Sequence, residues 1–211
     1  MCAVPIFTRD GQSVLFVHVP KTGGTSIERM FIRAGWDVGL RATPHTHPEQ
    51  SRLHRIPPQH LHAALLREML RLGRFDAMFL LTRDPLMRFR SEYVMRNKRR
   101  PGAGRAGHVE SWTHDLLARL EGNPAVLDNH LRPQHEFVLP QARVYRFEDG
   151  LEAAVADLSA RFSLDLPAEV PHTLESGAGG GLSSRDVEMT DKVAARIRAV
   201  YARDYEVFGY A

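Results

Sequence analysis

The sequence predicts an α/β fold in which a central parallel sheet is covered by helices. Three short segments are apolar and rich in β-branched or aromatic residues, as buried strands are. They span residues 14–19, 75–82 and 142–147. A segment with helical spacing of apolar residues follows each of them, at residues 25–34, 85–100 and 151–162. Strands that alternate with helices form parallel sheets, because each helix returns the chain to the edge where the next strand begins.

Three further helices are expected, over residues 59–72, 108–120 and 183–208. The first has an apolar stripe that begins at Leu61, and Gly73 ends it. The last follows Ser183 and Asp186, which have the spacing of a capping box. Irregular or flexible segments are expected at residues 36–58, which are rich in proline, and at the glycine-rich residues 101–107 and 175–184.

The composition indicates one globular domain and argues against a membrane protein or a disulfide-rich secreted protein. The chain has 211 residues, of which 43% are hydrophobic, so we expect a single domain over residues 1–211. It contains no run of about 18 apolar residues that could span a membrane. The first residues lack the features of a signal peptide, and Cys2 is the single cysteine. We therefore expect a cytoplasmic protein.

The net charge of +3 is modest, but the basic residues are concentrated in one segment. Residues 83–105 contain eight Lys or Arg residues, against two acidic ones, Asp84 and Glu92. A solvated helix face would explain such a run, and so would a site for a strongly anionic ligand. Charge alone leaves nucleic acid open as a partner.

The segment after the first predicted strand has the features of a phosphate-binding loop. Pro20 ends the strand because proline has no N–H to give to a sheet. The loop then consists of Lys21, Thr22, Gly23, Gly24, Thr25 and Ser26, and a helix follows it. Such a loop directs backbone N–H groups and a helix N-terminus at one point, while the glycines allow close approach of an anion. A purely structural strand–turn–helix remains the alternative.

The order of residues in this loop differs from the Walker A pattern, in which the lysine follows the glycines. Here Lys21 precedes Gly23 and Gly24, and the order P-K-T-G-G-T-S resembles the 5′-phosphosulfate loop of sulfotransferases that use 3′-phosphoadenosine-5′-phosphosulfate (PAPS).

A second motif supports the same resemblance. Residues 80–93 read LLTRDPLMRFRSEY, which is similar to the R-D/N-P-x-x-R-x-x-S-x-Y pattern of the 3′-phosphate motif in these sulfotransferases. Arg83 lies where a strand should end, the edge at which open α/β sheets bind ligands. An arginine there and Ser91 on the next helix can hold one phosphate group. An Arg83–Asp84 pair that caps the helix is the structural alternative.

The resemblance extends over nearly the whole chain. The segments DNHLRPQHEFV, VYRFEDGLEAAVADL and YARDYEVFGY are similar to segments of carbohydrate sulfotransferases. The resemblance implies a three-layer α/β/α P-loop-like fold. Unlike Golgi-resident relatives, this chain shows no membrane anchor and no cysteines for disulfides, so it resembles a soluble, bacterial-type member. A glycosaminoglycan acceptor is correspondingly uncertain.

The implied reaction is transfer of a sulfuryl group from PAPS to a hydroxyl or amine of an unidentified acceptor, such as a carbohydrate or a lipid. Lys21 would stabilise the charge that develops on the bridging oxygen of the departing phosphate. Backbone N–H groups of residues 23–26 would hold the 5′-phosphate, and Arg83 with Ser91 the 3′-phosphate. No divalent metal is expected, because the sulfuryl group carries less charge than a phosphoryl group.

Histidine is the expected general base. His60 is the first candidate, because we expect it at the N-terminus of the helix over residues 59–72, where the helix dipole keeps an imidazole neutral. The resembling family also has its proposed base before this helix. His62 is the second candidate. His18, inside a strand, is expected to be a hydrogen-bonded core residue, and a metal cluster of His45, His47 and His54 is disfavoured because these residues lie in a proline-rich segment without cysteines.

Two other functions stay open from the sequence. An atypical P-loop kinase would need acidic residues that bind a metal ion beside the loop, and it should prefer ATP. A module that binds polyanions or nucleic acid would rely on the basic residues 83–105, although we expect no stable nucleic-acid partner. The oligomeric state and the acceptor are not predicted.

Overall fold

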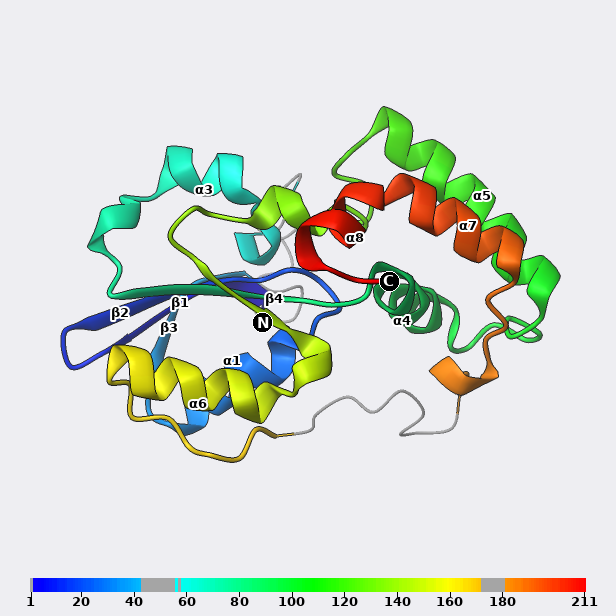
Figure 1. Cartoon of the computed structure of the whole chain (residues 1–211). Helices are drawn as coiled ribbons and strands as arrows, with labels where there is room; N and C mark the ends of the chain where they lie inside the picture. The colour runs from blue at the N-terminus through cyan, green and yellow to red at the C-terminus, as the bar shows by residue number, and fades with distance from the viewer. Residues whose placement is uncertain (1, 43–55, 57, 172–180) are drawn as a thin grey trace.

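The computed structural model describes residues 2–42, 56, 58–171 and 181–211, and it has a five-stranded sheet at its centre (Figure 1). The strands are β1 (Cys2–Arg9), β2 (Gln12–Val17), β3 (Asp37–Ala42), β4 (Ala77–Thr82) and β5 (Arg143–Arg146). Their order in the sheet is β3-β1-β2-β4-β5. The pairs β2–β4 and β4–β5 are parallel, whereas β1 is antiparallel to both β2 and β3.

The prediction of a parallel sheet is therefore correct only for the half that carries β2, β4 and β5. The strands that the prediction missed are β1 and β3. A local signal for β1 was present, because Asp10 and Gly11 form a two-residue connection to β2 with φ values of 50° and 82°. Asp-Gly favours such hairpin turns, in which both residues adopt positive φ. β3 lies at the start of the segment predicted to be irregular, and its sequence, DVGLRA, has a glycine in its interior, which weakens a strand signal.

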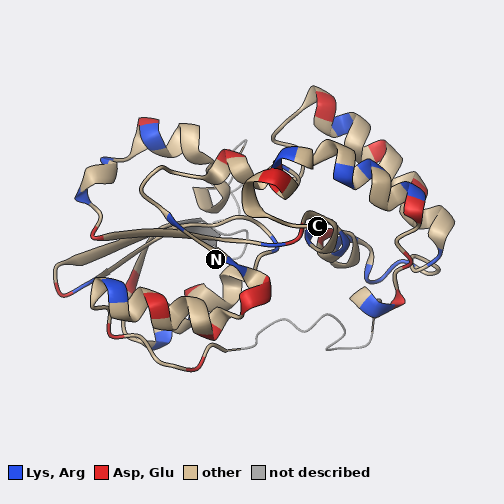
Figure 2. Ribbon diagram, in the orientation of Figure 1, with Lys and Arg blue, Asp and Glu red and all other residues tan. Residues whose placement is uncertain are grey.

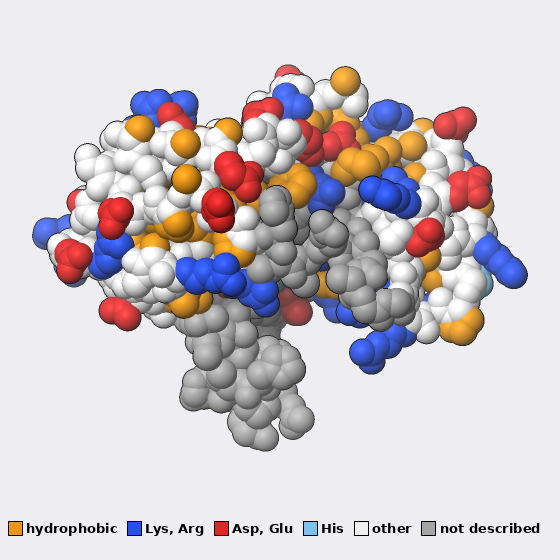
Figure 3. Space-filling model, turned by 90° about the horizontal axis from the view of Figure 1, so that it is seen from below, with side chains coloured by type: hydrophobic (Ala, Val, Ile, Leu, Met, Phe, Trp, Pro, Cys, Tyr) orange, Lys and Arg blue, Asp and Glu red, His pale blue; other side chains and the backbone are white. Residues whose placement is uncertain are grey.

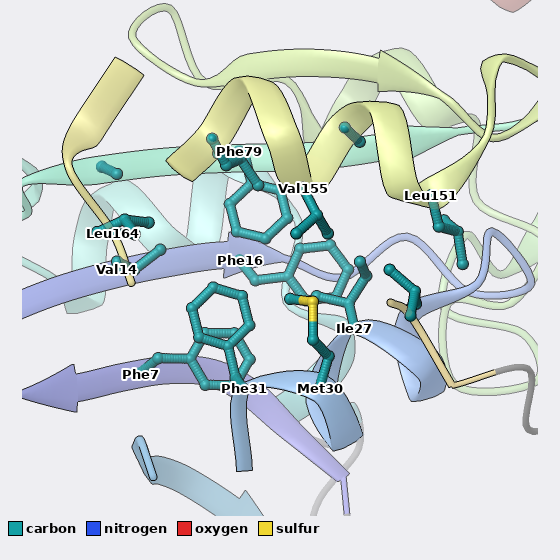
Figure 4. Packing of buried hydrophobic residues seen from close by; sticks show 14 of the residues in the cluster. Phe7, Val14, Phe16, Ile27, Met30, Phe31, Phe79, Leu151, Val155 and Leu164 are labelled. Atoms are coloured by element: carbon teal, nitrogen blue, oxygen red, sulfur yellow. The ribbon is translucent and has the colours of Figure 1, made fainter. Parts of the chain in front are cut away.

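Helices α1 (Gly24–Arg33) and α6 (Leu151–Phe162) cover one face of the sheet (Figure 1). Four phenylalanines form the centre of this layer (Figure 4). The rings of Phe7 and Phe31 stack at 3.9 Å between centroids, and those of Phe16 and Phe79 at 4.8 Å. Each such side chain contributes roughly 1.5–3 kcal/mol when it is fully buried, so this cluster anchors α1 beneath β2 and β4.

The opposite face of the sheet is covered by α3 (Ala63–Met69) and by the 3₁₀ helix η3 (Gln134–Phe137). Leu15 and Val17 point to this side, whereas Val14 and Phe16 point to the other, as the two-residue period of a strand requires. Because both faces are covered, β2 is a nearly continuous apolar run, and that is the pattern by which the sequence predicted it.

The second part of the fold is helical and lies beyond the carboxyl end of β4 (Figure 1). It contains α4 (Pro85–Asn97), α5 (Ala106–Gly122), α7 (Asp191–Val200) and α8 (Ala202–Phe208). Their apolar faces form one cluster that includes Tyr93 and Trp112, whose rings meet edge to face at 5.1 Å. Basic and acidic residues are interspersed on the outer surfaces of α5 and α7 (Figure 2). Within the described residues, no helix combines the length and apolarity needed to cross a bilayer.

Two predicted helices differ from the structure. The helix expected over residues 59–72 begins only at Ala63, and the 3₁₀ helix η1 (Pro58–His60) precedes it. The long helix expected after Ser183 consists of three pieces, η5 (Ser184–Asp186), α7 and α8. Ser183 and Asp186 do form a capping box, but it caps η5. Part of the loop predicted at residues 175–184 lies outside the described residues.

Candidate active site

A cavity of about 580 Å³ lies where the carboxyl ends of β2 and β4 meet α1 and α4. It is lined by most of the residues that the sequence singled out, namely Lys21, Gly23, Gly24, Thr25, Ser26, His60, Arg83 and Ser91. The lining also includes residues that the sequence did not propose for the site, namely His18, Pro20, Gln59, Met95, His130, Phe147, Gly150, Leu151 and Glu152. Open α/β sheets bind ligands at this edge.

The loop between β2 and α1 is closed by its own side chains. Thr22 is buried, and its Oγ1 donates a hydrogen bond to the carbonyl oxygen of Val19 at 2.8 Å. Thr22 is not among the residues that line the cavity, so its hydroxyl shapes the turn. The N–H of Ser26 donates to the carbonyl oxygen of Gly23 at 3.0 Å. The earlier N–H groups of α1 have no intrahelical acceptor, as at every helix N-terminus.

Gly23 and Gly24 are required because protein side chains fill the space that a Cβ atom would occupy. A Cβ on Gly24 would lie 2.1 Å from Nε2 of His18. A Cβ on Gly23 would lie 3.0 Å from the ring of Phe147, and this residue has a φ of +95°. The sequence predicts that the glycines allow the close approach of an anion. In the structure, the neighbouring rings already demand them.

Lys21 extends along the cavity wall towards α4. Its Nζ lies 3.3 Å from Sδ of Met95. Burial lowers the pKa of Lys21 from its usual value; Glu92 opposes this effect, whereas Arg83 adds to it. The ammonium group is therefore held in a partly desolvated position, where a developing negative charge would stabilise it strongly.

Arg83 follows β4 directly, and its backbone is fixed on both sides by Gln134. The N–H of Arg83 donates to Oε1 of Gln134 at 2.9 Å, and Nε2 of Gln134 donates to the Arg83 carbonyl at 2.7 Å. The guanidinium lies 4.6 Å from the ring centre of Phe147, and Nη1 donates to the carbonyl of Lys21 at 3.4 Å. Gln134 is held in turn by Asp204 of α8, whose Oδ2 accepts from the Gln134 N–H at 2.7 Å.

The family model described as "Sulfotransferase family" matches residues 4–211 of this chain, nearly its whole length. The chain belongs to the sulfotransferase family. Searches of curated proteins and of solved structures gave no match. The resemblance predicted from the loop and from residues 80–93 is confirmed, and the family's general reaction, sulfuryl transfer, follows from it.

The second arginine of the sulfotransferase-like motif, Arg88, links three parts of the site. It is buried, and its Nε donates to the carbonyl of Pro20 at 3.0 Å. Its Nη2 donates to the carbonyls of His130 and Arg132 at 2.7 and 3.0 Å. One side chain of α4 thus holds both the loop that carries Lys21 and the segment that carries His130, a role that the motif alone did not reveal.

Of the two histidines proposed as the base, His60 lines the cavity and His62 does not. His60 is buried in η1, and its Nδ1 lies 3.0 Å from the carbonyl oxygen of Asp128. Its pKa is held well below the usual value, first by burial and then by His130 and His18. The sequence predicted that His60 stays neutral, and the lowered pKa agrees with this direction. The predicted cause, the N-terminus of an α-helix, is wrong because α3 begins three residues later. His62 is the N-cap residue of α3.

His18 is buried, as expected for a core residue, but it also lines the cavity. Its Nδ1 lies 3.0 Å from Oε1 of Glu28, although the two atoms lack hydrogen-bond geometry. His45, His47 and His54 lie outside the described residues. Within the part of the chain that is described, no group of three or more His, Cys, Asp or Glu side chains is arranged to hold a metal ion.

Proposed function

We propose that this chain is a PAPS-dependent sulfotransferase that transfers the sulfuryl group to a hydroxyl or amine of a small-molecule, lipid or carbohydrate acceptor. The observation that carries the proposal is the convergence of both phosphate motifs, Lys21–Ser26 and Arg83 with Ser91, on one cavity. These motifs are some 60 residues apart in the chain. The strand–loop–helix unit from β2 to α1 also supports a P-loop-like description of the fold.

In this proposal, the N–H groups at the start of α1 bind the 5′-phosphate, and Thr25 and Ser26 add hydroxyl groups to the same wall. The first turn of α1 has no acidic residue, which suits an anion. Arg83 and Ser91 bind the 3′-phosphate, with the guanidinium as a charged fork. Thr22, which the sequence grouped with these ligands, contributes through the shape of the loop.

The sulfuryl group moves in line from the bridging oxygen to the acceptor. The acceptor oxygen or nitrogen forms a bond to sulfur while the bond to the 5′-phosphate oxygen breaks, and the leaving electron pair stays on that oxygen. Lys21 stabilises this charge more in the transition state than in the ground state. From the sequence, His60 is the first candidate for the base and His62 the second. The carbonyl of Asp128 accepts from the Nδ1–H of His60, so the lone pair of this ring lies on Nε2.

The alternative functions lack comparable support. The basic residues 83–105 do not form one exposed face, because Arg88 is buried against carbonyl groups and Arg96 pairs with Glu92. On the face seen in Figure 3, basic and acidic side chains are scattered and do not gather in one patch. A kinase would need carboxylates beside the loop to bind a metal ion. Among the described residues, no group of three or more His, Cys, Asp or Glu side chains is arranged for this.

Thermal unfolding with three ligands tests the proposed function. Adenosine 3′,5′-bisphosphate should raise the melting temperature at concentrations where ATP and heparin have a smaller effect, because a ligand that binds only the native state stabilises it. A larger shift with ATP would favour a kinase, and a salt-sensitive shift with heparin alone would favour a polyanion-binding module. A radiolabelled-donor screen of sugars, lipids and phenols would then identify the acceptor.

A further inference from the structure

The cavity wall contains a buried carboxylate–imidazole pair that the proposed function does not use. Glu92 follows Ser91 on α4 and is fully buried. Its Oε2 lies 2.7 Å from Nδ1 of His130, and its Oε1 accepts from Nε of Arg96 at 2.8 Å. His130 itself lines the cavity. A buried carboxylate is costly unless charged or hydrogen-bonding groups satisfy it, and here both oxygens are satisfied.

This pairing determines the tautomer of His130. The hydrogen bonds from His130 and Arg96 lower the pKa of Glu92 to about 2, although burial opposes them, so the carboxylate is ionised at neutral pH. An ionised carboxylate can only accept, and Nδ1 of His130 must therefore carry the hydrogen. The lone pair is left on Nε2. This is the arrangement by which a carboxylate orients a catalytic histidine in hydrolases.

The backbone that carries His130 is held in an unusual conformation. Leu127, Asp128 and Asn129 are consecutive residues with φ values of 51°, 60° and 65°. Left-handed backbone in non-glycine residues costs energy and persists only where surrounding contacts impose it, often at functional sites. Two contacts do so here: Nδ2 of Asn129 donates to the carbonyl of His60 at 2.8 Å, and Arg88 holds the carbonyl of His130.

His60 and His130 are neighbours with different abilities to hold a proton. Their rings meet edge to face, with centroids 4.6 Å apart. A protonated His60 would be a buried cation: burial, His130 and His18 lower its pKa, and the hydrogen bond to the Asp128 carbonyl opposes them only in part. A protonated His130 would form an ion pair with Glu92. Burial lowers the pKa of His130 as well, but Glu92 directly opposes that effect, while Arg96 and Lys21 add to it.

We infer that His130, oriented by Glu92, is the catalytic residue that takes the proton from the acceptor. The inference rests on the proposed function. The acceptor's O–H or N–H bond breaks and an N–H bond forms at Nε2 of His130, while the acceptor atom bonds to sulfur and the electron pair of the breaking S–O bond leaves on the 5′-phosphate oxygen beside Lys21. The imidazolium, paired with Glu92, then releases the proton to solvent. His60 supports the segment through its contacts with Asp128 and Asn129.

Imidazole titration by NMR tests this assignment without an acceptor. The full-length protein is titrated free and with adenosine 3′,5′-bisphosphate, and the resonances are assigned with His130→Asn and His60→Asn. We expect His130 to take up its proton at a higher pH than His60. The charged groups around it are Glu92 and Arg96 from α4, Lys21 from the loop, Arg88 and the neighbouring His60. In Glu92→Gln, the titration of His130 should move to lower pH, because its cation loses the ion pair.

Turnover with the acceptor found by the donor screen provides the second readout. His130→Asn should reduce turnover by about 10²–10⁴-fold, the usual contribution of a general base, with nearly unchanged affinity for adenosine 3′,5′-bisphosphate. In Glu92→Gln, the acidic limb of the pH–rate profile should shift to lower pH, which a purely structural role would not cause. His60→Asn is the matched control and should keep the acidic limb.

Two results would overturn the assignment: a His60 that titrates above His130, or an acidic limb that is lost in His60→Asn and kept in His130→Asn. If the wild type does not bind adenosine 3′,5′-bisphosphate, the proposed function is refuted instead. The titration of the free protein would still show which of the two histidines takes up its proton at the higher pH.

Discussion

Replacement of Gly24 by alanine tests how the phosphate-binding loop is built. At position 24 the backbone has an ordinary helical conformation, so alanine would normally stabilise the start of α1. The structure predicts the opposite, because the new Cβ would lie 2.1 Å from Nε2 of His18. Real Cβ contacts are essentially never shorter than 3.0 Å, so the ring or the loop must move by most of an ångström.

His18 has little room to move. It is buried, it lies against Glu28, and its ring is 5.3 Å from those of both Phe16 and His60. Overpacking of this kind typically costs about 1–3 kcal/mol. For a chain of this size, a loss of 1 kcal/mol lowers the melting temperature by roughly 2–4 °C, so Gly24→Ala should unfold some 2–12 °C below the wild type.

The measurement is thermal unfolding by circular dichroism, combined with calorimetry of adenosine 3′,5′-bisphosphate. Gly107→Ala is the matched control, because nothing lies within 4 Å of its Cβ position in α5, and it should be neutral or slightly stabilising. In the double variant His18→Ala/Gly24→Ala, the effect of the second substitution should be smaller than in the wild-type background, since the two sites are in contact. If Gly24→Ala unfolds at the wild-type temperature or above, the packing explanation of this glycine is wrong.

Three other predictions follow from the site. Lys21→Ala should fold normally but lose roughly 100- to 1000-fold in turnover, the cost of one transition-state donor, and turnover within a few-fold of the wild type would remove Lys21 from the mechanism. Arg83→Ala should weaken adenosine 3′,5′-bisphosphate by about 2–5 kcal/mol and adenosine 5′-phosphate only slightly; equal weakening of both in calorimetry would mean that Arg83 supports the fold. Glu92 has a pKa lowered from 4.5 to about 2, so its contribution to stability is fully present above pH 4.5 and is lost as the pH falls towards 2. The difference in stability between the wild type and Glu92→Gln, measured by urea unfolding, should therefore shrink over that range, and a constant difference would contradict the assigned pKa.

The loop after β2 and the motif after β4 could be predicted from the sequence because their signals are local. Pro20, the two glycines and the start of α1 lie within a few residues of each other, and Oδ1 of Asp84 caps α4 by accepting a 2.8 Å hydrogen bond from the N–H of Met87. Short-range steric and hydrogen-bonding preferences determine such units. The Asp10–Gly11 hairpin belongs to the same class, and its signal was present although the prediction did not use it.

The break between α7 and α8 could not be predicted in this way. No glycine or proline interrupts residues 191–208, yet the chain bends at Tyr201, whose hydroxyl donates to the carbonyl of Leu131 at 2.7 Å. Asp204 in α8 accepts hydrogen bonds from the N–H groups of Gln134 and His135. These bonds join segments some 70 residues apart, and they outweigh the local preference for one straight helix.

By itself, the sequence indicated a resemblance to sulfotransferases and placed Lys21 and Arg83 after predicted strands, because each motif is a contiguous unit that local preferences shape. The tertiary structure alone decided which histidines share the cavity with them. Glu92 and His130 are separated by 38 positions, and only the packing of α4 against the segment held by Arg88 brings their side chains to 2.7 Å. A histidine's ability to accept a proton depends on burial and on the charge beside it, and both are properties of the folded chain.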